Sequence, residues 1–190
     1  MLNRILIVAV AVAVVGGVIG SRGLAVFTST ANIGANTFTT GSISLTTSPT
    51  TALVTFAGMA PGDQVTAPVT VTNAGTLAMR YAITSATTEN VLAAQLSLTI
   101  KSGVTTCTNA AFGASGTVIY GPGVLGNTTA INAVGNPAQG AQAGDRTLAG
   151  AANEALCFNV SLPLATGNAF QTLTSTATFS FQGEQTVNNP

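Results

Sequence analysis

Two runs of alternating hydrophobic and polar residues stand in the middle of the chain. In the first, at 65–72, valine and alanine alternate with threonine and Pro68, and the second covers 77–83. An alternation of period two places one set of side chains on one face of a sheet, so both runs predict half-buried strands. Pro-Gly-Asp at 61–63 and Asn-Ala-Gly at 73–75 predict the turns before and between them. Because proline has no N–H to donate, the first strand is predicted to be an edge strand, or to be locally unpaired at Pro68.

The same alternation returns along the rest of the chain. It predicts further strands at 43–45, 54–56, 96–101, 118–120, 156–162 and 176–182. The segment 121–153 is an exception, because it is rich in Gly, Ala and Asn and only weakly periodic, which indicates a long insertion with short strand pieces or a flexible surface loop. Together the patterns predict an all-β fold, a jelly-roll-type β-sandwich of about eight strands.

The longest apolar run stands at the N-terminus. Arg4 precedes the uncharged residues 5–19, and small residues follow. A basic start, an apolar centre and small residues before a cut are typical of a secretory signal peptide, and a spanning helix needs a longer run of roughly 20 apolar residues. The expected cut follows Ala25 and releases Val26, and a cut one residue later is nearly as good. A permanent membrane anchor is the alternative.

These boundaries divide the chain into four parts. We expect a signal peptide at 1–25, an arm at 26–44, a sandwich domain at 45–183 and a C-terminal tail at 184–190. The membrane would be contacted only through the signal peptide before its cleavage, and the mature protein is expected to be secreted.

Composition adds that charged and catalytic side chains are scarce. The chain has five basic and five acidic residues and no histidine. So few charges make no footprint for a nucleic acid, and without histidine there is neither a His-Glu-x-x-His zinc helix nor an imidazole base. The acids also lack the spacing of a calcium loop. We therefore expect no catalytic residue, no metal site and no cofactor, although folding could bring Asp145 and Glu154 together.

Several segments, taken in order, resemble the TasA/camelysin family of secreted bacterial and archaeal fibre proteins. They are the central stretch 59–81 with Ala-Pro-Gly-Asp-Gln, the segment 27–45 with Asn-Thr-Phe-Thr-Thr-Gly-Ser, and the elements 157–163 and 179–185. The resemblance implies a cell-surface fibre subunit whose mature N-terminus is a pairing arm and whose partners are further copies of itself. Camelysins are also described as metalloendopeptidases, a function that the lack of histidine argues against.

The arm has too few apolar residues to build a layer of its own. Its residues Phe27, Ile33 and Phe38 could each fill a pocket in another subunit. A sandwich that is one strand short exposes unpaired N–H and C=O groups, to which an extended segment can add. We therefore predict an extracellular filament built by donor-strand complementation, with these three residues as anchors. A monomeric secreted module that binds a polymer or the cell wall is the alternative, and a metallopeptidase or a helical pilin fits less well.

Two cysteines and two glycosylation motifs complete the candidate sites. In a secreted chain the cysteines most simply form one disulfide, Cys107 to Cys157, and two buried thiols are the alternative. The pattern Asn-x-Ser/Thr occurs at Asn127 and Asn159. Because Asn159 lies in a predicted strand, Asn127 is the better candidate for a glycan.

Overall fold

A computed structural model describes residues 37–50 and 58–189 of the chain. The described residues from Thr40 onward belong to one compact unit, and those before it to another. The signal peptide and the strand expected at 54–56 lie outside the described residues. The elements are β1 (Leu45–Ser48), β2 (Gln64–Asn73), β3 (Met79–Thr87), β4 (Ser97–Ser102), β5 (Thr117–Val124), β6 (Ile131–Val134), β7 (Arg146–Leu148), β8 (Asn153–Ser161), a 3-10 helix (Asn168–Phe170) and β9 (Ala177–Gln185).

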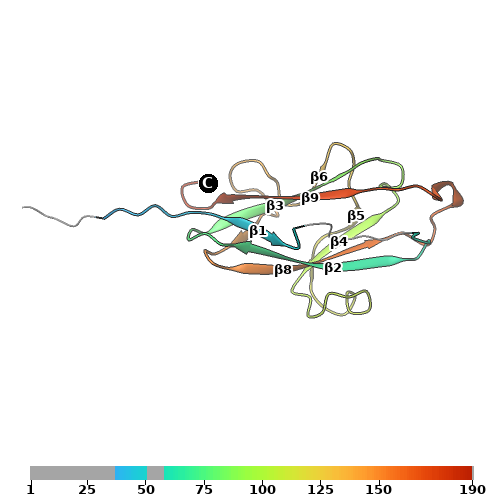
Figure 1. Ribbon diagram of the computed structural model, residues 1–190, viewed down its shortest axis with the longest axis horizontal. Helices are drawn as coiled ribbons and strands as arrows, with labels where there is room; N and C mark the ends of the chain where they lie inside the picture. Colours follow the sequence, from blue (N-terminus) through green and yellow to red (C-terminus); the bar gives the residue numbers. More distant parts are fainter. Residues whose placement is uncertain (1–36, 51–57, 190) are drawn as a thin grey trace, which may run out of the picture. The chain divides into compact units, whose positions relative to one another are not determined.

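The strands form two antiparallel sheets that pack face to face (Figure 1). Sheet A has the order β1-β2-β8-β4-β5. Sheet B has β3 at its centre, with β9 along one side and the short strands β6 and β7 end to end along the other. The chain passes repeatedly from one sheet to the other, and the prediction of an all-β sandwich is confirmed.

The alternation in the sequence corresponds to the two faces of each strand. In β2 the side chains of Val69 and Val71 are buried, and in β3 those of Met79, Tyr81 and Ile83 are buried. These residues form one core with the inward side chains of β4 and β8. Burial of a large apolar side chain contributes roughly 1.5–3 kcal/mol, so this shared core is what holds the two sheets together.

The two strands of the central stretch do not pair with each other, because the chain crosses between the sheets after Asn73. The fully buried Asn73 donates its Nδ2 to the carbonyls of Leu77 and Ala149, at 2.8 and 3.1 Å. Its Oδ1 accepts the N–H of Gly75 at 3.0 Å. A buried amide is stable only when its groups are paired. Asn73 therefore fixes the crossover, which the sequence pattern indicated only as a turn.

The segment just before β1 is fastened to this crossover. The carbonyl of Ser42 accepts the N–H groups of Thr76 and Leu77, and that of Ser44 accepts the N–H of Ala74. A Cβ on Gly75 would lie 2.3 Å from the oxygen of Ser42, so this close approach requires glycine. Residues 42–44, the end of the expected arm, are thus bound within their own domain.

The segment 121–153 contributes to both sheets and is not an addition to them. It contains the end of β5 and all of β6 and β7, which occupy one whole side of β3. The loop after β6 is held by the carboxylate of Asp145, which accepts the N–H groups of Asn136 and Gln142. The N–H of Gly140 binds Glu184, which also pairs with Arg80 at 2.9 Å. The predicted strand pieces are present, and β9 extends two residues beyond the expected end of the domain at 183.

One polar group of side chains links the two sheets through the core. Glu154 of β8 accepts the hydroxyl of Tyr81 at 2.6 Å and also binds the guanidinium of Arg146, the cross-strand neighbour of Tyr81 in sheet B. Burial, together with the hydrogen bond to Glu154, raises the pKa of Tyr81 above its ordinary value, so the phenol remains a donor. The hydrogen bonds with Glu154 raise the pKa of Arg146.

We predict that Glu154→Gln lowers the free energy of unfolding by about 1–3 kcal/mol, because the half-buried Arg146 and the buried Tyr81 lose a charged acceptor. Tyr81→Phe, which removes only one hydroxyl, should cost about 1 kcal/mol. Denaturant unfolding of the three proteins measures both changes. A Glu154→Gln variant as stable as the native protein would contradict this account of the link.

Candidate functional site

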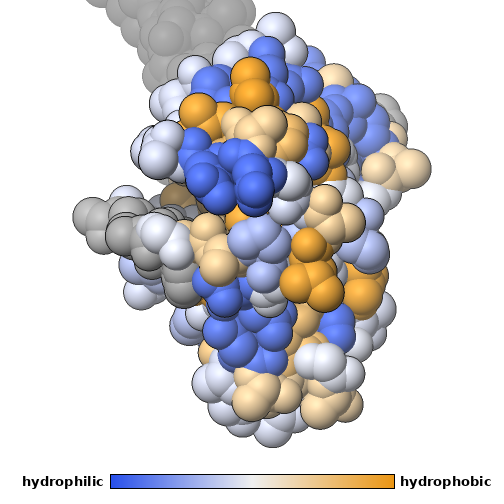
Figure 2. Space-filling view, turned by 90° about the vertical axis from the view of Figure 1, so that its right-hand side faces the viewer, coloured by the Kyte–Doolittle hydropathy of each residue, from blue (hydrophilic) through white to orange (hydrophobic). Residues whose placement is uncertain are grey.

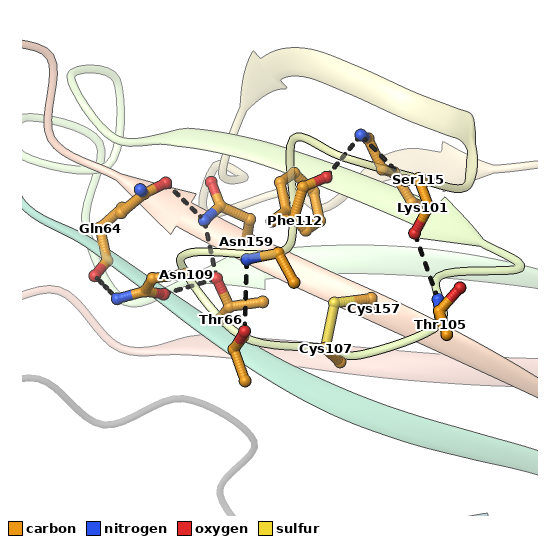
Figure 3. The surroundings of a disulfide bond; sticks show 12 residues. Gln64, Thr66, Lys101, Thr105, Cys107, Asn109, Phe112, Ser115, Cys157 and Asn159 are labelled. Carbon is orange, nitrogen blue, oxygen red and sulfur yellow. Dashed lines mark hydrogen bonds between the residues drawn. A yellow bond between two sulfur atoms is a disulfide. The ribbon is translucent and has the colours of Figure 1, made fainter.

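A disulfide joins the loop 103–116 to the middle of sheet A (Figure 3). It connects Cys107 to Cys157 of β8, with the two Cα atoms 5.6 Å apart, and the described residues contain no free cysteine. Cys157 lies opposite Pro68 in the register of β2 and β8. The disulfide expected from the sequence is therefore present, at the centre of the outer face of the sheet.

Polar contacts hold the same loop against that face. Lys101 of β4 donates its Nζ to the carbonyls of Phe112 and Ser115, at 2.7 and 3.3 Å, and lies 4.7 Å from the centre of the Phe112 ring. Cys157 and Asn159 are almost completely buried although they point away from the core, because this loop covers them. The role of Lys101 was not predicted. The one feature of the sequence that pointed to such a role is a lysine within a predicted strand, in a chain that has very few charged residues.

Strand β9, at the edge of sheet B, has a partner strand on one side only among the described strands. All nine of its residues pair with β3, and no other described strand pairs with it. Just beyond the ends of the two strands, Thr88 donates its N–H to the carbonyl of Thr176, and Thr186 donates its N–H to the carbonyl of Ala78. Backbone groups alternate in direction along an antiparallel strand, so those of Ala177, Phe179 and Phe181 point away from β3. They form an open edge along the sandwich.

Apolar side chains that are only partly buried follow this edge. Phe179 packs edge to face on Phe158 of β8 with the ring centres 5.0 Å apart, and Phe181 lies 6.5 Å from the ring of Tyr81. At the other end of β9, the position of Gly183 is next to the side chain of Leu45. The edge strand β1 of sheet A thus lies on the same side of the sandwich as β9. An added strand here would find both unpaired backbone groups and incompletely covered apolar side chains.

The neighbouring edge of sheet A is different. β1 pairs only with 70–73 of β2, so among the described strands the first part of β2 pairs with β8 alone. Asn73 donates its N–H toward β8, and by alternation the nitrogen of Pro68 faces the open side. The sequence prediction that β2 is unpaired at Pro68 agrees with this arrangement.

The donor-strand anchors lie almost entirely outside the described part of the chain. Phe38 is described, and 94% of its surface is exposed. Phe27 and Ile33 are outside the described residues, as are the cleavage residues Ala25 and Val26. An aromatic side chain exposed to this degree is suited to binding in a pocket elsewhere.

The two glycosylation motifs differ in accessibility. Asn159 is buried and donates its Nδ2 to Gln64 and Thr66. Asn127 lies in the loop between β5 and β6, where its Oδ1 accepts the N–H and the hydroxyl of Thr129. The preference for Asn127 as the candidate is therefore consistent with the burial of Asn159.

The structure does not bring the acids into one site. Asp145 accepts two backbone N–H groups of its own loop, whereas Glu154 binds Tyr81 and Arg146. Within 37–50 and 58–189 no group of three or more His, Cys, Asp or Glu side chains is placed to hold a metal ion.

The surface is dominated by neutral polar side chains, since the charged ones are engaged within the chain. On the face shown in Figure 2, apolar side chains form small separate patches among polar ones. A surface with so little free charge offers little repulsion between copies. The charged residues of the described part of the chain, each with an intramolecular partner, are Asp63, Arg80, Glu89, Lys101, Asp145, Arg146, Glu154 and Glu184.

We predict that Cys157→Ser lowers the free energy of unfolding by up to about 4 kcal/mol, because the native bond closes a loop of 50 residues in the unfolded chain. Denaturant unfolding under oxidising conditions measures the loss. The native protein with dithiothreitol should approach the stability of the variant, and a native protein in which two thiols titrate before reduction would contradict the prediction.

Comparison with known families agrees with the fold and the motifs. The family described as camelysin metallo-endopeptidase matches residues 1–101, more than half of the chain. No curated protein matches the chain. Proteins of this family are secreted or located at the cell surface, and no helix in the described part of the chain is long and apolar enough to cross a membrane. The chain therefore belongs to the TasA/camelysin family.

Proposed function

We propose that the protein is the structural subunit of an extracellular filament, in which the N-terminal arm of one copy adds to β9 of the next. The observation that carries this proposal is the open edge of β9, a nine-residue strand with one partner and partly buried aromatic side chains. A strand edge of this kind is a template for an extended segment from another chain. Because the arm and the edge are different surfaces, the contact is head to tail and propagates.

The length of the arm suits this edge. Residues 26–40 are fifteen in number and precede the segment that is fastened to the crossover. Fully extended, they reach about 50 Å, whereas a strand as long as β9 spans about 30 Å. The arm is therefore long enough to pair along the whole of β9 and to bridge the gap to its own domain.

Backbone hydrogen bonds would supply much of the affinity, and the aromatic residues of the arm would add to it. Phe38 is fully available, and Phe179 and Phe181 of the acceptor are incompletely covered. Aromatic pairs contribute about 0.5–1.5 kcal/mol beyond the area they bury. With so few free charges, assembly should depend only weakly on ionic strength. Removal of the signal peptide would free the arm and thereby start assembly.

The first test removes the arm. A chain that starts at Gly41 keeps the contacts of Ser42 and Ser44 with the crossover and should fold with unchanged thermal stability. It should form no filaments, as judged by negative-stain microscopy, under conditions in which the mature protein does. Filaments of normal appearance from the truncated chain would rule out the arm as donor.

A second variant tests the acceptor with the arm intact. Ala177→Pro removes an N–H that points away from β3, so β9 keeps its own ladder but loses a donor on the open edge. We expect filament formation to be reduced at least tenfold. Ser180→Ala is the matched control, since it changes an exposed side chain of the same strand and leaves the edge groups in place. Equal assembly by all three proteins would exclude β9 as the acceptor.

The family description makes a metalloendopeptidase the competing function. The chain has no histidine, and its described acids are engaged singly with other partners. We predict that the purified protein cleaves casein no faster with added zinc than with a chelator. A zinc-dependent activity that is lost in Glu154→Gln or Asp145→Asn, in protein that remains folded, would favour the enzyme.

A further inference from the structure

We propose that Asn109, positioned by the Cys107–Cys157 disulfide, closes the sheet edge nearest to β9, the N-terminal half of β2, against the addition of a strand. This inference rests on the proposed function, because it concerns where the arm of another copy can bind. It assigns to the loop 103–116 the role of directing that arm away from β2 and toward β9, which lies on the same side of the sandwich as β1.

The direction of the backbone groups of β2 carries the first step. Leu162 donates its N–H to the carbonyl of Asp63, and Asn73 donates its N–H to Ala152. The backbone groups of Asp63 and Asn73, both at odd-numbered positions, thus point toward β8. By the alternation of an antiparallel ladder, Gln64, Thr66 and Pro68 direct their backbone groups away from β8, toward the edge where β1 has ended.

Asn109 hydrogen-bonds to a backbone carbonyl on this edge of β2. Its Nδ2 donates to the carbonyl of Gln64 at 2.8 Å, so the acceptor that an incoming strand would use first is already taken. Its Oδ1 accepts the hydroxyl of Thr66 at 2.6 Å, and Thr66 in turn accepts Nδ2 of Asn159 at 3.0 Å. Figure 3 shows this network beside the disulfide. At the other end of this segment, Pro68 has no N–H to donate. Both ends of 64–68 are therefore unable to pair fully with an added strand.

The disulfide gives the side chain its position. Asn109 is two residues after Cys107, whose partner Cys157 is opposite Pro68 in the register of the sheet. The loop is therefore tethered over the centre of sheet A and extends across β2 to its outer side. Along 177–183 the edge of β9 has no proline, and within the described part of the chain no side chain hydrogen-bonds to its backbone. Of these two edges, as the described residues form them, that of β2 at 64–68 is closed and that of β9 is open, so a strand approaching this side of the sandwich is directed to β9.

The test measures strand addition at the two edges separately. A synthetic peptide of residues 27–40 is added in excess to the native protein, to Asn109→Ala, and to the control Asn90→Ala, which removes an exposed amide that joins two other loops. Hydrogen–deuterium exchange is then followed by mass spectrometry in fragments that cover 64–69 and 177–185. A double variant, Cys107→Ser with Cys157→Ser, releases the loop in a second way.

In the native protein and in Asn90→Ala, the peptide should leave exchange at 64–69 unchanged. In Asn109→Ala it should slow exchange there by about tenfold, as expected for newly paired backbone groups. Slowed exchange at 64–69 in the native protein, or no change in Asn109→Ala, would overturn the proposal. If the double variant does not fold, Asn109→Ala alone decides. The fragment 177–185 tests the proposed function independently, since peptide binding at β9 should slow its exchange in every variant.

Discussion

The pairing of β8 between β2 and β4 is the interaction on which the rest of the structure depends. β8 is paired along both sides, and its side chains alternate between the core and the outer face of sheet A. On the core side, Phe158 packs on Phe179 and Glu154 binds Tyr81, so both contacts reach sheet B. On the outer side, Cys157 holds the loop 103–116. A single central strand thus connects two sheets and one covering loop.

The covering of the sheets determines where other molecules can bind. Loop 103–116 covers the outer face of sheet A, and the loop after β6 is held over sheet B through Gly140, Glu184 and Arg80. At the edges of the sheets, backbone groups that are not paired within a sheet must bind water or another strand. Among the described strands, Asn109 binds a backbone group on the edge of β2, and β9 has an edge without such a contact along 177–183.

The scarcity of charge has a structural and a functional consequence. Each charged side chain of the described residues binds another group of the same chain, either in an ion pair or through hydrogen bonds to the backbone of a loop. The exposed surface is therefore left to threonine, serine, asparagine and glutamine. Copies of such a protein can approach one another with little electrostatic cost, which suits the proposed filament subunit. In the proposed filament, specificity would depend on the directional hydrogen bonds of strand edges, because few charges are available for complementarity.

The sequence by itself determined the fold class, the positions of the long strands and the disulfide. Period-two alternation identified β2, β4, β8 and most of β3 and β9, because each has one face in the core. It could not identify β6 and β7, which have only four and three residues, too few to show a period. It also could not assign strands to sheets, since alternation records which face is buried and not which strand lies alongside.

Tertiary structure alone decided which backbone edges are open and which side chains meet. Lys101 and Asn109 are ordinary polar residues in the sequence, and they acquire roles only because the disulfide brings their loop over sheet A. Asp145 and Glu154 are close in the sequence but bind different partners. Asp145 faces its own loop, whereas Glu154 faces the core. Such contacts join residues that are distant along the chain, and they depend on the register and direction of strands. Local sequence patterns carry no information about either.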